Sequence, residues 1–285
     1  MAINWYPGHI AKAERELKEK LNLVDVIIEV VDARIPLSSK YLNIEKLIGA
    51  KPRLVLLNKA DLADKEKNKI WRKYFSDIGI NAILTSASSN KDISVIISNL
   101  IELGKEKMLQ LAAKGILPRP IRVMIIGLPN VGKSSIINKL IGKKKAKTGA
   151  KAGVTRIQQW VRINPRVELL DTPGIIPMKL ENQAAAYKLA MVNSVGEATY
   201  DDIDVSRRLI ELLKNKYPEQ IMNYYKLSSK EEITLENITK SRNLLLLGGE
   251  LDINRGATMV LSDFRSGKTG HFTLDDIIIK EQTNE

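Results

Sequence analysis

The chain has 285 residues, with 45 Lys and Arg against 33 Asp and Glu, so its formal net charge is +12. Hydrophobic residues make up 44% and charged residues 27%, close to the globular average, which excludes a wholly disordered or fibrous chain. The chain has no cysteine and only two histidines, His9 and His271, which excludes disulfide scaffolds and Cys/His zinc sites.

The positive charge favours a polyanionic partner such as RNA, because Lys and Arg gain by displacing counterions from phosphates. Scattered lysines on an ordinary solvated surface are the alternative interpretation. No apolar run reaches membrane-spanning length, and the N-terminus lacks the pattern of a signal peptide. We therefore expect a cytoplasmic monomer with no membrane or DNA partner.

Short apolar runs alternate with helical patterns in the first part of the chain, which is typical of βαβ units and a parallel sheet. The runs contain few polar residues, as expected for strands covered on both faces. The predicted strands are 24–31, 53–57, 82–85, 122–126 and 167–170, and the predicted helices include 64–77 and 93–113. Pro118 and Pro120 prevent the second helix from continuing.

The second predicted strand leads into four residues of the pattern N-K-x-D: Asn58, Lys59, Ala60 and Asp61. An Asp here can accept hydrogen bonds from N1–H and the exocyclic amine of guanine, a donor pair that adenine lacks. Asn58 is expected to brace the loop, and the stem of Lys59 to cover the ring. Ser86 and Ala87 follow the next strand and supply a backbone N–H suited to guanine O6.

The strongest motif, G-x-x-x-x-G-K-S from Gly127 to Ser134, lies between the fourth predicted strand and a helical pattern. Its glycines allow backbone N–H groups to surround phosphates at a helix N-terminus. Lys133 is expected to neutralise the β- and γ-phosphates, and the Ser134 hydroxyl to bind Mg²⁺. The expected nucleotide-binding residues of this P-loop are Asn130, Val131, Gly132, Lys133, Ser134 and Ser135.

Two later segments are typical of switches that sense the γ-phosphate. Asp171 follows the strand 167–170 and is expected to hold Mg²⁺ through water, while the N–H of Gly174 reaches the γ-phosphate. Thr155 is expected to give the metal a second hydroxyl. Next to it lies a basic loop, whose coupling to nucleotide state would let GTP change how its charge is presented; an ordinary solvated run is the alternative. The loop contains Lys143, Lys144, Lys145, Lys147 and Lys151.

Apolar residues take helical spacing after residue 170, over 182–195 and 205–213, with predicted breaks at 217–218 and 248–249. We therefore predict a GTPase domain over residues 1–178, which holds the motifs above, and a smaller helical domain over 179–285. Ser266 to Thr269 imitates the end of a P-loop, but no strand pattern leads into it, so we assign it no nucleotide.

The motifs resemble those of translation-factor-related GTPases, but N-K-x-D and S-A precede the P-loop, the threonine switch and D-x-x-G. This order indicates a circular permutation. The whole chain resembles the ribosome biogenesis GTPase A family, also called YlqF-type. The residues that carry the resemblance are the permuted motifs and the segments 5–9, 32–36, 248–252 and 263–265. The fold class expected is α/β: a circularly permuted P-loop GTPase domain, mostly parallel with helices on both faces, followed by a smaller all-helical domain.

The resemblance implies a factor that acts late in assembly of the large (50S) ribosomal subunit, with GTP hydrolysis stimulated by the particle and coupled to release. Ile175 stands where regulatory GTPases have a water-orienting glutamine, and the family implies that His9 supplies the missing polarity. An RNA-contacting or flexible His9 is the alternative. Asn130 resembles the K⁺ ligand of potassium-activated GTPases, and equal rates in sodium and potassium would refute that role.

Three other functions remain open from the sequence. An ATP-using P-loop kinase or transporter subunit is disfavoured by the guanine motifs, and competition between GTP and ATP would discriminate it. An RNA-binding module with a vestigial nucleotide site would show no GTP turnover. A GTP-switched RNA-binding protein in another process, such as rRNA or tRNA maturation, would lack preference for the large subunit.

Overall fold

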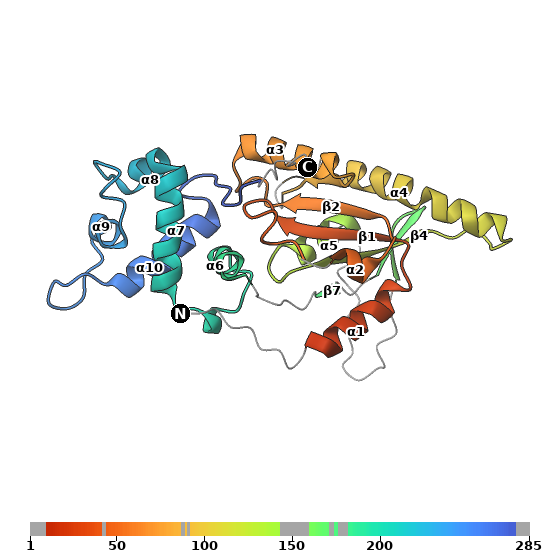
Figure 1. The fold of residues 1–285 in the computed structure, drawn as a ribbon, viewed down its shortest axis with the longest axis horizontal. Coiled ribbons are helices and arrows are strands. Elements are labelled where there is room, and N and C mark those ends of the chain that lie inside the picture. The colour runs from red at the N-terminus through yellow and green to blue at the C-terminus, as the bar shows by residue number, and fades with distance from the viewer. Residues whose placement is uncertain are drawn as a thin grey trace, which may run out of the picture.

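The computed structural model describes residues 10–41, 44–86, 89, 92–142, 160–170, 174–175 and 182–277. Within them, an α/β region built on one sheet is followed along the chain by a region of helices, which lies at one end of the molecule (Figure 1). This arrangement confirms the predicted fold class. No helix in the described part of the chain is long and apolar enough to cross a bilayer.

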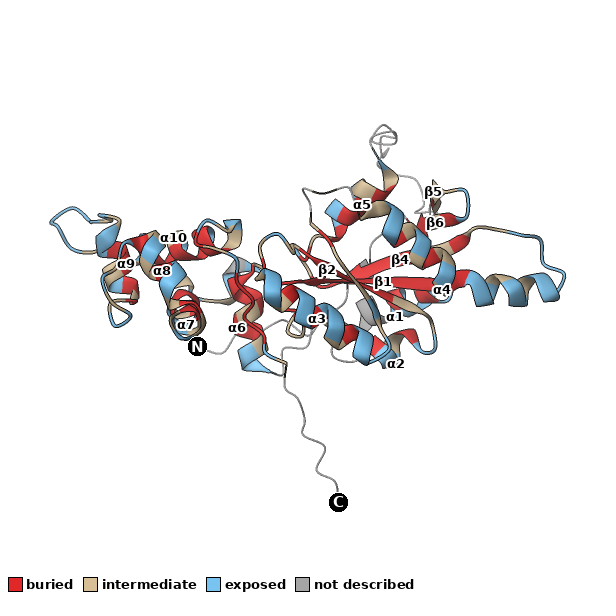
Figure 2. Ribbon diagram, turned by 90° about the horizontal axis from the view of Figure 1, so that it is seen from above, coloured by how far each residue is buried: buried red, intermediate tan, exposed pale blue. Residues whose placement is uncertain are grey.

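The described residues form a seven-stranded sheet with the order β3-β2-β1-β4-β6-β5, and β7 pairs with β4 beyond the end of β6. All pairs are parallel except β5 with β6. The strands are β1 (Val26–Asp32), β2 (Arg53–Asn58), β3 (Asn81–Leu84), β4 (Ile121–Gly127), β5 (Trp160–Asn164), β6 (Val167–Leu170) and β7 (Gly174–Ile175). The central strand β1 is buried along its whole length, as its apolar run predicts (Figure 2).

Helices cover both faces of the sheet because successive strand residues point to opposite sides. Val55 and Leu57 of β2 pack in one cluster with Trp71 and Phe75 of α3, whereas Leu54 lies in the larger cluster on the other side. The helices of this region are α1 (Ile10–Leu21), α2 (Ile44–Ile48), α3 (Lys65–Asp77), α4 (Ile93–Ala113) and α5 (Lys133–Ile141). The C-terminal half of α4 extends beyond the sheet (Figure 1).

The helical region consists of α6 (Gln183–Met191), the 3₁₀ turn η3 (Glu197–Thr199), α7 (Asp202–Lys216), α8 (Pro218–Tyr225), α9 (Leu235–Ser241) and α10 (Ile253–Ser266). Pro218 begins α8, where its missing N–H is not needed, so the predicted break at 217–218 is confirmed. Gly256 allows α10 to approach α9, because a Cβ there would lie 2.0 Å from Thr239 Oγ1. The expected domain boundary at 178/179 lies outside the described residues.

After α10 the chain returns to the α/β region. The N–H of Phe272 donates to the carbonyl of Leu62 at 3.2 Å, and the N–H of Leu274 donates to that of Arg34 at 2.7 Å. The carboxylate of Asp275 accepts from the N–H groups of residues 37 and 38, each at 2.8 Å. No feature of the sequence indicated this return, because it depends on loops that are far away along the chain.

Candidate nucleotide-binding site

The P-loop joins β4 to α5, and its backbone requires glycine at two positions. Gly132 has φ 99° and Gly127 has φ 154°. A Cβ at Gly132 would lie 2.1 Å from Asn58 Nδ2, and one at Gly127 would lie 2.6 Å from the carbonyl oxygen of Val30. The loop is therefore packed tightly against β1 and β2, with the first turn of α5 directly after it, an arrangement suited to an anion.

Lys133 is folded over the loop at the start of α5. Its Nζ donates to the carbonyl oxygens of Gly127 at 3.0 Å and Leu128 at 2.6 Å. Only 8% of the residue is exposed, and this burial lowers the pKa of Lys133 to about 8. The ammonium is thus held at the loop by backbone carbonyls, which phosphate oxygens can replace.

The pKa of Lys133 predicts how nucleotide affinity depends on pH. Phosphate oxygens favour the charged amine, so binding raises this pKa and requires a proton once the pH exceeds about 8. Below pH 8 the affinity for GDP should be nearly constant, and above it should fall, by up to about tenfold per pH unit. Titration with a fluorescent GDP from pH 7 to 8.8 measures this change in affinity. Lys133→Arg is the control, because arginine stays charged over this range and its GDP affinity should not depend on pH in this way. A flat profile for the unchanged protein would contradict the prediction.

The remaining predicted phosphate and metal ligands are only partly described. Ser134 and Ser135 are exposed in the first turn of α5. Gly174 pairs with Ile126 in β7, which brings its backbone beside the end of β4. Thr155 and Asp171, predicted for the metal, lie outside the described residues, as do Ala87, predicted for guanine, and His9, predicted for catalysis.

Asn58 connects the N-K-x-D loop to the P-loop. It ends β2, is buried, and donates from Nδ2 to the carbonyl oxygen of Val131 at 2.8 Å. Its Oδ1 accepts a hydrogen bond from the Thr85 hydroxyl at 3.1 Å. The Asn58 side chain therefore fixes the distance between the loop expected to read the base and the loop expected to hold the phosphates.

The rest of the N-K-x-D loop, Lys59 to Asp61, lies between the P-loop and the end of β3. Lys59 has φ 59°, and its Nζ donates to the carbonyl oxygen of Asn130 at 2.8 Å. The N–H of Ala60 donates to the carbonyl oxygen of Thr85 at 3.0 Å. Asp61 is exposed, and together with Ser86 it lines a groove of about 1100 Å³ beside β3. The carboxylate expected to recognise guanine is thus accessible to a ligand.

Lys139 of α5 is a further link that sequence reasoning missed. Its Nζ donates to the carbonyl oxygen of Ser86 and lies 3.4 Å from Asp92 Oδ2. This bond ties the helix after the P-loop to the S-A segment. A lysine on a helix gives no signal of such a contact in the sequence, because most lysines are solvated.

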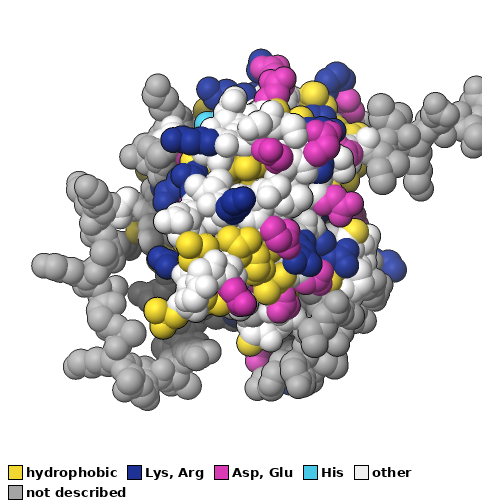
Figure 3. Space-filling model, turned by 90° about the vertical axis from the view of Figure 1, so that its left-hand side faces the viewer, with side chains coloured by type: hydrophobic (Ala, Val, Ile, Leu, Met, Phe, Trp, Pro, Cys, Tyr) yellow, Lys and Arg dark blue, Asp and Glu magenta, His cyan; other side chains and the backbone are white. Residues whose placement is uncertain are grey.

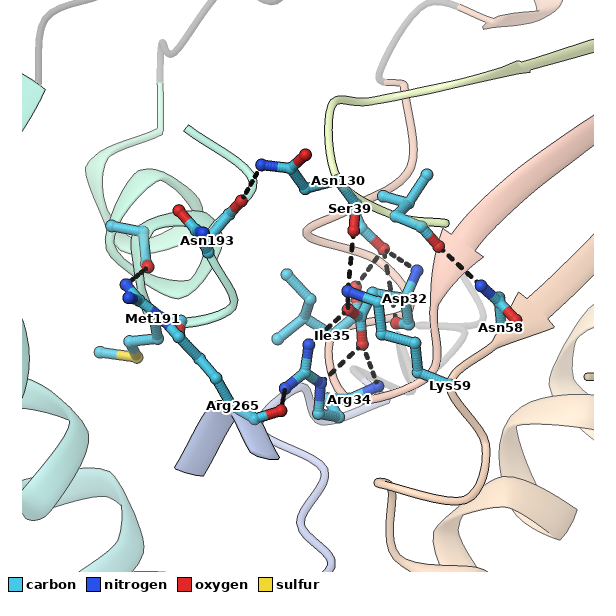
Figure 4. A network of polar contacts seen from close by, with 12 residues as sticks. Asp32, Arg34, Ile35, Ser39, Asn58, Lys59, Asn130, Met191, Asn193 and Arg265 are labelled. Carbon is cyan, nitrogen blue, oxygen red and sulfur yellow. Dashed lines mark hydrogen bonds and ion pairs between the residues drawn. The ribbon is translucent and has the colours of Figure 1, made fainter. Parts of the chain in front are cut away.

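Asp32 lies at the centre of the polar network in Figure 4. It ends β1 beside Asn58, is fully buried, and accepts from Arg34 Nη2 at 2.7 Å and Nε at 2.9 Å. Its Oδ2 also lies 2.9 Å from Lys59 Nζ. Burial alone would raise the pKa of Asp32, but the charges and hydrogen bonds of Arg34 and Lys59 outweigh it and lower the pKa to about 2.

The same network reaches the helical region (Figure 4). Arg34 Nη1 donates to the carbonyl oxygen of Arg265 at 3.4 Å, and its guanidinium lies 5.4 Å from the centre of the Phe264 ring. Asn130 Nδ2 donates to the carbonyl oxygen of Asn193, after α6, at 2.7 Å. The loop after β1 and the P-loop therefore each contact the helices.

Segment 32–36 carries a family resemblance in the sequence, but no role was predicted for it. A usable signal was present, because an acidic residue directly after an apolar strand lies at the carboxyl edge of a parallel sheet, where ligand sites form. Asn58 and the P-loop follow strands that end at the same edge.

Comparisons with known proteins agree with these motifs. The family model described as "50S ribosome-binding GTPase" matches residues 122–237. A protein of Priestia megaterium named ribosome biogenesis GTPase A is 43% identical over 286 residues, which cover 99% of each chain. One of the same name from Thermotoga maritima is 32% identical, covering 96% of this chain and 94% of the relative.

Two solved structures of YlqF have the same fold. The GDP-bound form superposes with a TM-score of 0.67 at 29% identity and covers 92% of this chain and 98% of the other. The GNP-bound form from T. maritima has a TM-score of 0.67 at 29% identity, and the match covers 93% of this chain and 97% of the other. Both structures hold guanine nucleotides.

Proposed function

The chain belongs to the ribosome biogenesis GTPase A family and is therefore a GTP-hydrolysing enzyme, and we propose that it promotes a late step in maturation of the large (50S) ribosomal subunit. In this proposal the protein binds the immature particle with GTP, and the particle stimulates hydrolysis and thereby release. The observation that carries the proposal is a pair of contacts to the helical region. Asn130 of the P-loop contacts Asn193, and Arg34, which shares the Asp32 carboxylate with Lys59 of the N-K-x-D loop, contacts Arg265. They give nucleotide state a physical route to the helices.

The proposed nucleotide contacts divide between two loops. Asp61 and the backbone of Ser86 and Ala87 recognise guanine, while the P-loop N–H groups and Lys133 hold the phosphates. Ser134, Thr155 and Asp171 would hold Mg²⁺, since hydroxyl and carboxylate oxygens are the ligands it prefers and Ser134 is exposed at the start of α5. When bound, the ion neutralises charge on the β- and γ-phosphates. The backbone N–H of Gly174 would donate a hydrogen bond to the γ-phosphate, so the position of this segment would depend on whether GTP or GDP is bound.

A role for Asn130 in binding K⁺ would use its amide oxygen. The amide nitrogen donates to the carbonyl oxygen of Asn193, which leaves Oδ1 outside this contact. A cation beside the phosphates would stabilise the charge that spreads during transfer, the task an arginine finger performs elsewhere.

Residues 179–285 are proposed as the RNA- or ribosome-binding domain. The boundary between residues 178 and 179 is the one predicted from the sequence. A partner particle that contains RNA would account for the net charge of +12, since contacts of Lys and Arg with phosphates release counterions. Binding that depends on such contacts should weaken steeply as salt increases.

Co-sedimentation with separated ribosomal subunits in GTP, GDP and a non-hydrolysable analogue tests the proposal. We expect binding to the large-subunit particle to be tightest with the analogue, and the particle to accelerate GTP turnover. Equal binding to both subunits, or turnover that the large subunit leaves unchanged, would favour the alternative role in another RNA process.

His9→Ala is expected to lower particle-stimulated turnover by about a hundredfold, because general-base or water-orienting groups contribute on that scale. GTP affinity should stay unchanged, since His9 is proposed to act on the attacking water and not on the nucleotide. Single-turnover kinetics with saturating particle, together with nucleotide titration, measure the two effects.

The matched control is His271→Ala, because the chain has only these two histidines and His271 is exposed after α10. This control should turn over like the unchanged protein. Loss of affinity and turnover together in His9→Ala would indicate a binding or folding defect and refute the catalytic role.

A further inference from the structure

The segment between α9 and α10 forms an ordered hairpin, defined here as residues 243–252. Leu245 and Leu251 form an antiparallel bridge, and the N–H of Leu246 donates to the carbonyl oxygen of Glu250 at 2.8 Å. Gly248 and Gly249 close the turn with φ of 107° and 87°. Because the turn is hydrogen-bonded and uses glycine where positive φ requires it, the hairpin holds its tip in a fixed conformation.

The tip of this hairpin presents leucine to solvent. Leu245 is 45% exposed, Leu246 50% and Leu247 106%. Figure 3, which views the molecule from the end where α9 lies, shows hydrophobic side chains gathered on this face. Neighbouring exposed leucines on a rigid turn do not contribute to the core, and such patches mark interaction sites.

The charge of the hairpin differs from that of the whole chain. Residues 243–252 contain no Lys or Arg but include Glu250 and Asp252, in a chain of net charge +12. Arg242, which precedes the hairpin, donates to the carbonyl oxygen of Tyr224 at 2.9 Å and lies over its ring. Asp252 caps α10 by accepting from the N–H of Arg255 at 3.0 Å, which leaves Glu250 as the carboxylate beside the exposed leucines. Glu250 and these leucines disfavour a phosphate backbone and favour an apolar pocket with a basic edge.

We propose that the hairpin is a docking element that inserts Leu247 into an apolar pocket, edged by Lys or Arg, on a protein component of the large-subunit particle. The inference rests on the proposed function for the identity of the particle. The remainder of the helical region would contact the particle separately, so the hairpin adds a mainly apolar contact to electrostatic ones. Its rigid turn limits the entropy lost on binding.

Leu247→Ser tests the hairpin without disturbing the core, because the side chain is fully exposed. We expect its affinity for purified immature large-subunit particles to fall at least roughly tenfold, as for loss of one buried leucine. Basal GTP turnover and GDP affinity should not change. The matched control is Leu117→Ser, which is 84% exposed in the turn after α4 and should bind the particle within about twofold of the unchanged protein.

A photo-crosslinking amino acid in place of Leu247 identifies the contact in the same purified complex. A crosslink to a particle protein supports the proposal, whereas crosslinks only to rRNA or to a second copy of this chain overturn it. If the unchanged protein fails to bind the particle, the proposed function fails and the inference with it. If the unchanged protein binds and Leu247→Ser binds equally well, the hairpin inference alone is refuted.

Discussion

The Asp61→Asn variant is expected to bind GTP at least about a hundredfold more weakly than the unchanged protein, because an amide cannot accept from guanine as a carboxylate does. Hydrogen bonds to a charged group contribute about 1.5 to 3 kcal/mol each, and guanine would offer two. The variant should gain affinity for xanthosine triphosphate, whose C2 oxygen can accept from the new amide. Competition binding with GTP, xanthosine triphosphate and ATP measures both changes.

Asp64→Asn is the control for this change. The Asp64 side chain caps α3 by accepting from the N–H groups of Glu66 at 2.9 Å and Lys67 at 3.1 Å. Asparagine caps helices as well as aspartate does, so nucleotide preference should stay the same. Unaltered GTP affinity in Asp61→Asn would show that another group recognises the base.

Asp32→Asn is expected to lower the free energy of unfolding by about 3 to 5 kcal/mol, because it removes the negative charge between two buried or half-buried cations. Arg34 and Lys59 both contact the Asp32 carboxylate. GDP affinity should also fall, since Lys59 would no longer be held between Asp32 and the P-loop. Urea unfolding and titration with labelled GDP measure these effects.

The pH dependence of stability gives a second readout for Asp32. Its pKa is about 2 in the folded protein and 3.8 for an unperturbed Asp, so folding favours the ionised form. The lowered pKa of Asp32 adds about 2 kcal/mol to the free energy of unfolding. This stabilisation is complete above pH 3.8 and is lost as the pH falls toward 2. Asp32→Asn lacks this stabilisation, so the difference in free energy of unfolding between the unchanged protein and the variant should shrink as the pH falls from 3.8 to 2.

Asp77→Asn is the matched control because Asp77 also pairs with a lysine, Lys73, at 2.9 Å, but on the surface of α3. Exposed pairs of this kind contribute up to about 1 kcal/mol and often nothing measurable. A loss of stability in Asp32→Asn no larger than that of the control would mean that the buried network does not stabilise the fold.

Much of the sheet could be predicted because buried parallel strands consist of apolar runs. The strands β1, β2, β3, β4 and β6 lie within two residues of their predicted limits, and α4 has the predicted bounds. β5 was not predicted, because Arg162 interrupts its apolar pattern and it pairs antiparallel at an edge. β7 has only two residues, too few for any periodicity.

The predicted site rested on motifs whose spacing carries chemistry, and the structure brings Asn58, Lys59 and the P-loop together. The contacts of Asp32 could not be predicted in the same way. They depend on the register of β1 against β2, which puts Asp32 opposite Asn58, and register is a property of the folded sheet. The helical contact of Arg34 depends likewise on how α10 packs.

The return of the chain after α10 brings Asp275 between the helical region and the α/β region. Its Oδ1 lies 2.8 Å from Lys188 Nζ of α6 and accepts a hydrogen bond from the Ser38 hydroxyl at 2.7 Å. Asp275 thus connects α6, at the start of the helical region, to the loop after β1. Because one carboxylate holds α6 and the loop after β1 together, we expect the helical region to stay attached to the α/β region when the bound nucleotide changes.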